Sequence, residues 1–218
     1  MGGFKVKYKG VIFDLDGVIV STDEFHFQSW KKLAQREHID FNQEINHRLR
    51  GISRMESLDI LLEKSSLEYT LLQKEEMAMY KNQIYVKLLS NLSPSDLLPN
   101  VVKTIEFLQA HHIKIAIGSS SKNTKTILKQ IGLLNSFDAI VDGTDITKSK
   151  PNPEVFLKAA KKLDLLPEEC MVIEDAIAGI NAAKAANMMA VAIHDAVKSK
   201  HADIKIKDLY EIANFFVK

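Results

Sequence analysis

Two pairs of acidic residues follow short apolar runs and could do chemistry together. Asp14 and Asp16 directly follow one run, and Glu174 and Asp175 directly follow another. If the runs are neighbouring parallel strands, all four carboxylates meet at one sheet edge, where charges about 4 Å apart repel by about 4 kcal/mol at an effective dielectric of about 20. Such a cluster needs protons or a cation, and oxygen ligands favour Mg²⁺. We therefore predict a magnesium site; the alternative for either pair alone is an acidic turn that ends a strand.

A polar loop that follows another apolar run could hold a phosphate group. It precedes a helical pattern, and hydroxyls and free backbone N–H groups at a helix N-terminus bind phosphate. The alternative is an ordinary Ser/Asn helix cap. Lys150 could neutralise a phosphate at the same edge, although a loop lysine is usually solvated, and the Lys150–Pro151 peptide could be cis. The loop consists of Gly118, Ser119, Ser120, Ser121, Lys122 and Asn123.

The elements that position these residues alternate between apolar runs and helical patterns. Runs without polar alternation suit strands that are covered on both faces, as in a parallel sheet. Strand alternating with helix is typical of a doubly wound α/β fold. Predicted strands are 11–13, 113–117, 139–141, 171–173 and 190–193, and helical spacing occurs at 101–108, 127–131, 156–163 and 177–180.

The interval 24–89 breaks the alternation because it contains only helical patterns. Two apolar faces are predicted in it, and the turn-rich segment 93–100 leads back to the α/β part. A helical insertion after the first strand would sit over the carboxyl edge of the sheet, where open α/β folds bind ligands. The two faces comprise Phe27, Trp30 and Ala34, and Met77, Tyr80, Ile84 and Leu88.

The overall composition limits the classes of protein to consider. The chain has 218 residues, 46% hydrophobic and 26% charged, which is typical of a globular protein. A net charge of +1 argues against a broad nucleic-acid surface. The single cysteine, Cys170, excludes an internal disulfide, and no apolar run approaches the ~20 residues of a membrane helix. We expect a soluble cytoplasmic protein, and no Gly-x-Gly-x-x-Gly follows any strand to suggest dinucleotide binding.

Taken in order, these pieces resemble the four motifs of the haloacid dehalogenase (HAD) superfamily of phosphotransferases. The motifs are residues 14–18 (Asp-Leu-Asp-Gly-Val), Ser119, Lys150 with Pro151, and Glu174 with Asp175. The resemblance covers nearly the whole chain. It implies a Rossmann-like HAD core made of residues 1–21 and 93–218, and a small all-helical cap made of residues 22–92.

Within the superfamily the chain is most similar to the β-phosphoglucomutase family. Residues 13–19 lead into Thr22, His26 and Trp30 with that family's spacing, and Lys81 falls where its cap lysine lies. The segment Gly51, Ile52, Ser53 and Arg54, with Ser57, resembles its substrate-specificity loop. Two residues depart from the pattern: Arg50 stands where lysine is expected and Ser120 where alanine is expected. Arginine keeps the charge but changes reach and geometry, so the sugar specificity is what these changes affect.

The resemblance implies a role for each matching residue. Asp14 would be the nucleophile and Asp16 the general acid and base. In the closed form we expect the pKa of Asp16 to be raised and His26 to contact it. Mg²⁺ would be held by the Asp14 side chain, the Asp16 carbonyl and Asp175, with Glu174 supporting. Trp30 is expected either in the cap core or beneath the sugar. The transferring phosphate would bind to Ser119 and Lys150, and the distal one to Arg54, Ser121, Lys122 and Asn123.

The function implied is interconversion of β-D-glucose 1-phosphate and β-D-glucose 6-phosphate through an aspartyl-phosphate and glucose 1,6-bisphosphate. The first alternative is a Mg²⁺-dependent sugar-phosphate phosphatase on the same scaffold, in which water attacks the phosphorylated aspartate. A non-enzymatic receiver-like module is the second, and the helical insertion and the Glu174–Asp175 pair argue against it. We expect a monomer that acts on hexose phosphates and binds neither nucleic acid nor membrane.

Overall fold

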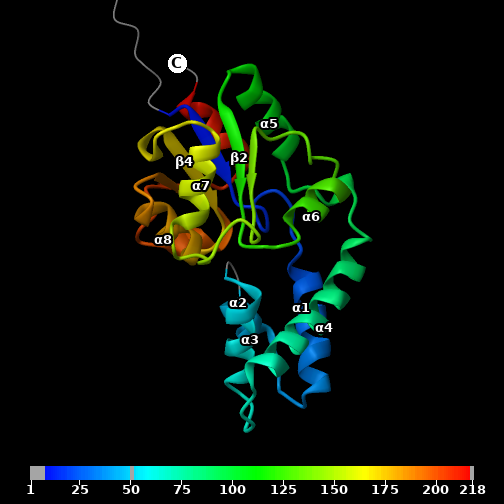
Figure 1. Cartoon of the computed structure of the whole chain (residues 1–218). Coiled ribbons are helices and arrows are strands. Elements are labelled where there is room, and N and C mark those ends of the chain that lie inside the picture. The colour runs from blue at the N-terminus through cyan, green and yellow to red at the C-terminus, as the bar shows by residue number, and fades with distance from the viewer. Residues whose placement is uncertain (1–7, 50–51, 217–218) are drawn as a thin grey trace, which may run out of the picture.

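The protein is built on a six-stranded parallel sheet with a helical segment projecting from one edge (Figure 1). The computed structural model describes residues 8–49 and 52–216. The strand order is β3-β2-β1-β4-β5-β6, and every neighbouring pair is parallel. The predicted doubly wound fold is therefore confirmed. The strands are β1 (Gly10–Phe13), β2 (Lys114–Gly118), β3 (Ala139–Val141), β4 (Cys170–Glu174), β5 (Met189–Ala192) and β6 (Ile204–Lys205).

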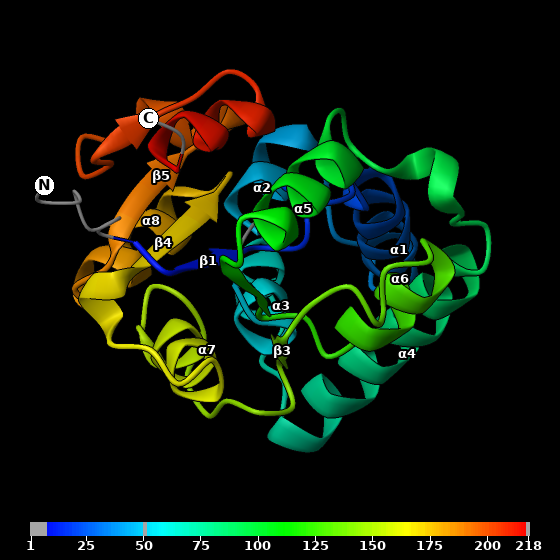
Figure 2. The ribbon, with the colours of Figure 1, turned by 90° about the horizontal axis from the view of Figure 1, so that it is seen from above.

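Helices cover both faces of the sheet, as Figure 2 shows from above. Successive strand residues point to opposite faces. Thus Val11 and Phe13 join one hydrophobic cluster with α5, α6 and the C-terminal η4, whereas Ile12 joins another with α7 and α8. These elements are α5 (Val101–Ala110), α6 (Thr124–Gln130), α7 (Glu154–Lys162), α8 (Ile177–Ala185) and the 3₁₀ segments η1 (Pro94–Asp96), η2 (Pro167–Glu169), η3 (His194–Lys198) and η4 (Leu209–Phe215).

Four helices between β1 and β2 form the helical insertion, which lies below the carboxyl edge of the sheet in Figure 1. As predicted, the described part of residues 24–89 contains no strand. The insertion has its own hydrophobic core, to which Trp30, Leu33, Leu58, Leu61 and Met77 contribute. Its helices are α1 (Asp23–Arg36), α2 (Gln43–Arg48), α3 (Arg54–Leu62) and α4 (Leu71–Leu89).

The predicted apolar face of α4 is displaced by one residue in the structure. Tyr80, Ile84 and Leu88 are only half-buried, while the buried residues are Met77, Ala78, Lys81, Tyr85 and Leu89. A lysine thus occupies the middle of the buried face. Its ammonium lies 4.7 Å from the centre of the Trp30 ring and 4.5 Å from that of Tyr85, so cation–π attraction offsets part of its burial. The predicted α1 face is partly right: Trp30 and Ala34 are buried and Phe27 is half-buried.

The edge strand β6 was not expected, because two residues are too few to produce a periodic pattern. Cys170 is a fully buried free thiol. None of the described helices combines the length and apolar character needed to cross a lipid bilayer. The domain boundaries at residues 21/22 and 92/93 stay a prediction.

Candidate active site

Three of the four predicted carboxylates come together at the carboxyl ends of two neighbouring strands. The register of β1 and β4 pairs Phe13 with Ile173, so Asp14 and Glu174 leave the sheet side by side. Asp14, Glu174 and Asp175 each offer an oxygen atom, and these atoms lie within 4.8 Å of one another. The strand adjacency assumed from the sequence is thus the observed one.

Lys150 is buried inside this acidic cluster. Its Nζ donates hydrogen bonds to Asp14 Oδ1 and Glu174 Oε1, and it also lies 4.7 Å from the centre of the Phe156 ring. The side chain is 1% exposed, and the Lys150–Pro151 peptide is cis. Burial alone would lower the pKa of Lys150, but Asp14 and Glu174 raise it above its ordinary value, so the lysine stays charged.

One ammonium does not balance three carboxylates. Burial raises the pKa of Glu174, although Lys150 opposes this effect, and burial together with the charges of Glu174 and Asp14 raises the pKa of Asp175. Without a further cation, protons must therefore neutralise part of the cluster. Closely spaced oxygens with excess negative charge fit a hard divalent cation that takes the place of those protons.

Two glycines allow the carboxylates to approach each other. Gly17 has a φ of +85°, and a Cβ there would lie 2.1 Å from Asp175 Oδ2. A Cβ at Gly179, in α8, would lie 1.9 Å from the Glu174 carboxyl carbon. Glu174 is fully buried and bonded to Lys150, so a side chain at position 179 would force it out of this position.

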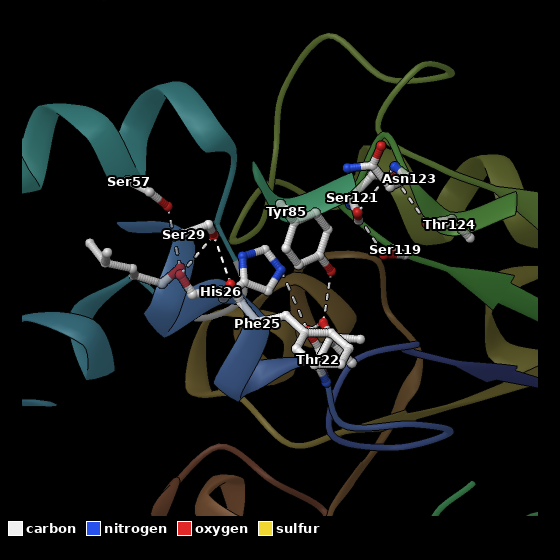
Figure 3. Close-up of polar contacts among 12 residues, drawn as sticks. Thr22, Phe25, His26, Ser29, Ser57, Tyr85, Ser119, Ser121, Asn123 and Thr124 are labelled. Carbon is white, nitrogen blue, oxygen red and sulfur yellow. Dashed lines mark hydrogen bonds and ion pairs between the residues drawn. The ribbon is translucent and has the colours of Figure 1, made fainter. Parts of the chain in front are cut away.

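The fourth carboxylate, Asp16, is held apart by the start of α1 (Figure 3 shows the residues that hold it). Thr22 donates to both of its oxygens, from the backbone N at 2.7 Å and from the hydroxyl. His26 Nε2 lies 3.6 Å from Asp16 Oδ2, which agrees with the predicted contact. Burial raises the pKa of Asp16 to about 7, although the Thr22 hydrogen bonds lower it. The direction of this pKa shift is the one expected for the closed form.

Behind Asp16, two side chains of α4, Lys81 and Tyr85, form hydrogen bonds with residues at the start of α1. Lys81 Nζ lies 2.8 Å from His26 Nδ1, and the Tyr85 hydroxyl lies 2.8 Å from Thr22 Oγ1. Burial and the positive charge of Arg54 hold the pKa of Lys81 well below its usual range, and burial with Lys81 does the same for the pKa of His26. Burial thus disfavours the charged forms of both side chains behind Asp16.

The predicted phosphate loop bends back on itself before α6. Ser119 is buried, and its Oγ accepts from Ser121 N at 3.1 Å, while Ser121 Oγ accepts from Asn123 N at 3.2 Å (Figure 3). Thr124 donates its hydroxyl to Ser121 O at 2.9 Å. Asn123 Nδ2 donates to Asn82 Oδ1 on α4 at 2.9 Å, which joins the loop to the helical insertion.

Ser120, one of the departures from the family pattern, differs from its neighbours in this loop. Its Oγ is buried and has no hydrogen-bond partner among the residues that the structure describes. The loop backbone is also close to β3, because a Cβ at Gly143 would lie 2.3 Å from Ser120 O. The Ser120 hydroxyl is thus buried although the residue borders the cavity described below, whereas Lys122 is exposed.

A cavity of about 1200 Å³ lies between the sheet edge and the helical insertion. Most predicted site residues border it, and their positions span both parts of the chain. Trp30, Ser57 and Lys81 contribute to its wall although they are only 2–3% exposed. The predicted residues at the cavity are Asp14, Asp16, His26, Trp30, Ile52, Ser53, Arg54, Ser57, Lys81, Ser119, Ser120, Ser121, Lys122, Asn123, Lys150 and Asp175.

A few predicted residues do not border the cavity. Thr22 and Glu174 lie behind its wall, where Thr22 holds Asp16 and Glu174 holds Lys150. Thr22 was expected to bind substrate, but at 1% exposure it has no surface to offer. Arg50 and Gly51 lie outside the described residues.

Sequence reasoning missed several residues that the structure places at the site. Asn82 and Tyr85 follow Lys81 on α4 and border the cavity. A search for the buried face with Lys81 included would have found Tyr85 at i+4. Glu56 of the insertion accepts a hydrogen bond from Ser149, next to Lys150. No pattern in the sequence indicated that pair.

The comparisons with known proteins agree with this geometry. A family model described as haloacid dehalogenase-like hydrolase matches residues 8–187. A β-phosphoglucomutase from Bacillus subtilis (strain 168) is 43% identical over 206 residues, covering 94% of this chain and 91% of that protein. The chain belongs to the β-phosphoglucomutase family of the HAD superfamily.

Other relatives are consistent with this membership. A crystal structure of β-phosphoglucomutase from Clostridium difficile has a TM-score of 0.90 and 37% identity, covering 96% of this chain and 97% of that one. A phosphorylated carbohydrates phosphatase from Thermotoga maritima is 30% identical over 83% of this chain and 82% of its own. The superfamily thus includes both mutases and phosphatases among the relatives of this chain.

The acidic cluster predicts how stability depends on pH and metal. Carboxyl groups with raised pKa values stabilise the fold at low pH, and this contribution is lost as pH rises from their ordinary values through the raised ones. We expect the melting temperature of the metal-free protein to fall between pH 5 and about pH 9, and the increase on adding Mg²⁺ to grow over the same range. Differential scanning fluorimetry measures both.

Asp175→Asn is the matched variant for this experiment. It removes one of the raised groups, so both the fall with pH and the increase with Mg²⁺ should shrink. A Mg²⁺ effect of equal size at pH 5 and pH 9 in the unmodified protein would contradict the prediction.

The unpartnered hydroxyl of Ser120 predicts a gain in stability on its removal. A buried polar group without a partner costs about 1–3 kcal/mol, so Ser120→Ala should raise the free energy of unfolding by about 1 kcal/mol. Ser121→Ala is the control, because it removes an acceptor that Asn123 N uses and should lower that free energy. Urea unfolding compares the two, and similar losses in both variants would mean that the Ser120 hydroxyl has a partner after all.

Proposed function

We propose that the protein is a Mg²⁺-dependent β-phosphoglucomutase that interconverts β-D-glucose 1-phosphate and β-D-glucose 6-phosphate. The observation that carries this proposal is a single cavity bordered both by Asp14 and Lys150 of the core and by Arg54 of the helical insertion. The name of the 43% identical relative supports the same reaction.

In this proposal Asp14 is the nucleophile. An aspartate needs no base to activate it at neutral pH, and an acyl-phosphate passes its phosphoryl group on readily. The Asp14 side chain is 11% exposed and borders the cavity, and Lys150 orients one of its oxygens. Lys150 and Ser119 lie at the same strand ends, where they would hold the transferring phosphate.

Mg²⁺ would be held by the side chains of Asp14 and Asp175 and by the Asp16 main-chain carbonyl, with Glu174 in support. When bound, it would offset the negative charge of the transferring phosphate oxygens. The closely spaced acidic oxygens described above support this assignment.

Asp16 would be the general acid and base. It must protonate the sugar oxygen that leaves and remove the proton from the hydroxyl that attacks phosphorylated Asp14. A pKa of about 7 keeps both forms of Asp16 populated at neutral pH, so one residue can serve both steps. His26, whose Nε2 lies near Asp16 Oδ2, would help to orient the Asp16 carboxylate.

Arg54 from the insertion would bind the phosphate that is not reacting, together with Ser121, Lys122 and Asn123 from the core. These groups border the same cavity from opposite sides. The bisphosphate formed in the first step must turn over between the two phosphate positions before it returns its other phosphate to Asp14. A helical cap of residues 22–92 would enclose it and exclude water.

The partners proposed are hexose phosphates. A cytoplasmic monomer without nucleic-acid or membrane partners remains part of this proposal. The specific alternative is a sugar-phosphate phosphatase, which the Thermotoga maritima relative favours. Arg54 argues for the mutase, because a phosphatase needs no second phosphate site.

The direct test follows ³¹P signals during incubation with Mg²⁺, β-glucose 1-phosphate and a trace of glucose 1,6-bisphosphate. We expect glucose 6-phosphate to accumulate with little inorganic phosphate, because the phosphorylated enzyme passes its group to a sugar hydroxyl. Asp14→Asn should abolish the conversion. Release of inorganic phosphate without formation of glucose 6-phosphate would contradict the mutase proposal and support the phosphatase alternative.

The variant Arg54→Ala should distinguish binding of the non-reacting phosphate from transfer of the reacting one. We expect mutase kcat/KM to fall roughly 10- to 100-fold, the range for losing charged hydrogen bonds, while phosphorylation of Asp14 by acetyl phosphate changes little. Arg36→Ala is the control, because Arg36 pairs with Glu37 and packs on Tyr80, away from the cavity. Equal losses of rate in both reactions would contradict the proposal that Arg54 binds the phosphate that is not reacting.

A further inference from the structure

Tyr85 is a buried tyrosine whose hydroxyl points at a residue of the site and not at solvent. It lies on α4, forms part of the wall of the cavity and is 1% exposed. Its hydroxyl makes one hydrogen bond among the described residues, to Thr22 Oγ1 at 2.8 Å. Figure 3 shows the ring above Thr22, with its hydroxyl pointing down at the threonine. A buried phenol is therefore directed at the residue that holds Asp16.

Thr22 occupies the N-cap position of α1 but makes no side-chain capping bond. Threonine at this position usually accepts from the first turn of its own helix. Here its hydroxyl instead donates to Asp16 Oδ2, while its backbone N donates to Oδ1. The Thr22 side chain is thus used to hold Asp16 and not to stabilise α1.

The number of hydrogen atoms fixes the direction of this chain. Threonine carries one hydroxyl hydrogen, and an ionised carboxylate can only accept. When that hydrogen goes to Asp16, the short contact between Thr22 and Tyr85 must use the Tyr85 hydrogen. When Asp16 is ionised, Tyr85 therefore donates to Thr22, and Thr22 donates to Asp16.

Tyr85 also contacts the second neighbour of Asp16. Its ring and the His26 imidazole have centroids 4.2 Å apart and are tilted by 36°. His26 and Thr22 are four residues apart, at the start of α1, and both approach Asp16 Oδ2. Tyr85 thus contacts both Thr22 and His26, the two residues that approach the Asp16 carboxylate.

We propose that Tyr85 is a positioning residue for Asp16, acting through the hydroxyl of Thr22. This inference rests on the proposed role of Asp16 as general acid and base. Without the Tyr85 hydroxyl, Thr22 Oγ1 loses a donor, and its own hydrogen can turn away from Asp16. The carboxylate then spends less time in the orientation that proton transfer to or from a sugar oxygen requires.

Tyr85→Phe tests this proposal because it keeps the ring and removes only the hydroxyl. The reaction with a sugar phosphate needs proton transfer at the sugar oxygen, whereas phosphorylation of Asp14 by acetyl phosphate expels acetate, which needs no proton. We expect kcat with the sugar phosphate to fall about 10-fold, the equivalent of about 1.4 kcal/mol, with KM changed less than 2-fold. The rate with acetyl phosphate should stay within 2-fold of the unmodified enzyme.

Tyr80→Phe is the matched control. It removes the hydroxyl of the other tyrosine on α4, whose ring packs on Arg36 outside the site, so both rates should be unchanged. Equal losses of both reactions in Tyr85→Phe would mean that the hydroxyl serves only the structure. No loss in either reaction would also overturn the proposal.

A double-mutant cycle tests the path through Thr22. Thr22→Val should slow the sugar reaction at least as much as Tyr85→Phe, and the double variant should be no slower than Thr22→Val alone. Thr22→Ser keeps the hydroxyl and should retain most of the rate. Additive losses would show that Tyr85 acts by another route. If Tyr85→Phe does not fold, Thr22→Ser and Thr22→Val still show whether the Thr22 hydroxyl contributes to the rate.

The test of the Tyr85 positioning role does not depend on whether the enzyme is a mutase or a phosphatase. If the unmodified enzyme releases inorganic phosphate and forms no glucose 6-phosphate, the proposed function fails. The same comparison then runs on sugar-phosphate hydrolysis, where the leaving sugar oxygen also needs a proton. A selective loss in Tyr85→Phe would still support the positioning role.

Discussion

The site depends on how negative charge is balanced where β1 and β4 end. Burying a carboxylate without a partner costs several kcal/mol, and here Asp14, Glu174 and Asp175 are brought together by two adjacent strands. Lys150 lies between two of them, and the remaining charge requires protons or a cation. The same requirement explains Gly17, because any side chain there would occupy the space of Asp175.

Much of this arrangement could be predicted because it depends on the backbone. A run of buried apolar residues identifies a strand whatever surrounds it, and parallel strands end at one edge. Residues directly after such runs, among them Asp14, Ser119 and Glu174, therefore had to meet once the strands were placed side by side. Lys150 is less local, since it reaches the cluster from a loop and only its motif pointed to it.

What could not be predicted depends on side-chain direction and on contacts between helices. Hydrophobic periodicity places charged residues outside, so it shifted the buried face of α4 by one position and left Lys81 exposed. Lys81 is buried because Trp30, from another helix, offers an aromatic face to its ammonium. Likewise, the spacing of Asp16 and Thr22 gave no sign that the threonine would hold the carboxylate and leave its own helix uncapped.

These contacts also determine where the two parts of the chain can separate. Thr22 occupies the N-cap position of α1 and Tyr85 lies on α4, and these two helices pack along each other, so the Tyr85–Thr22 hydrogen bond joins two neighbouring helices. Asp16 belongs to the loop that follows β1 in the core. If the helices turn away from the sheet as one body, the hydrogen bonds that must break include those from Thr22 to Asp16, as well as Asn123–Asn82 and Ser149–Glu56. The orientation of the acid and base is then tied to the position of the insertion, because the group that orients Asp16 leaves with it.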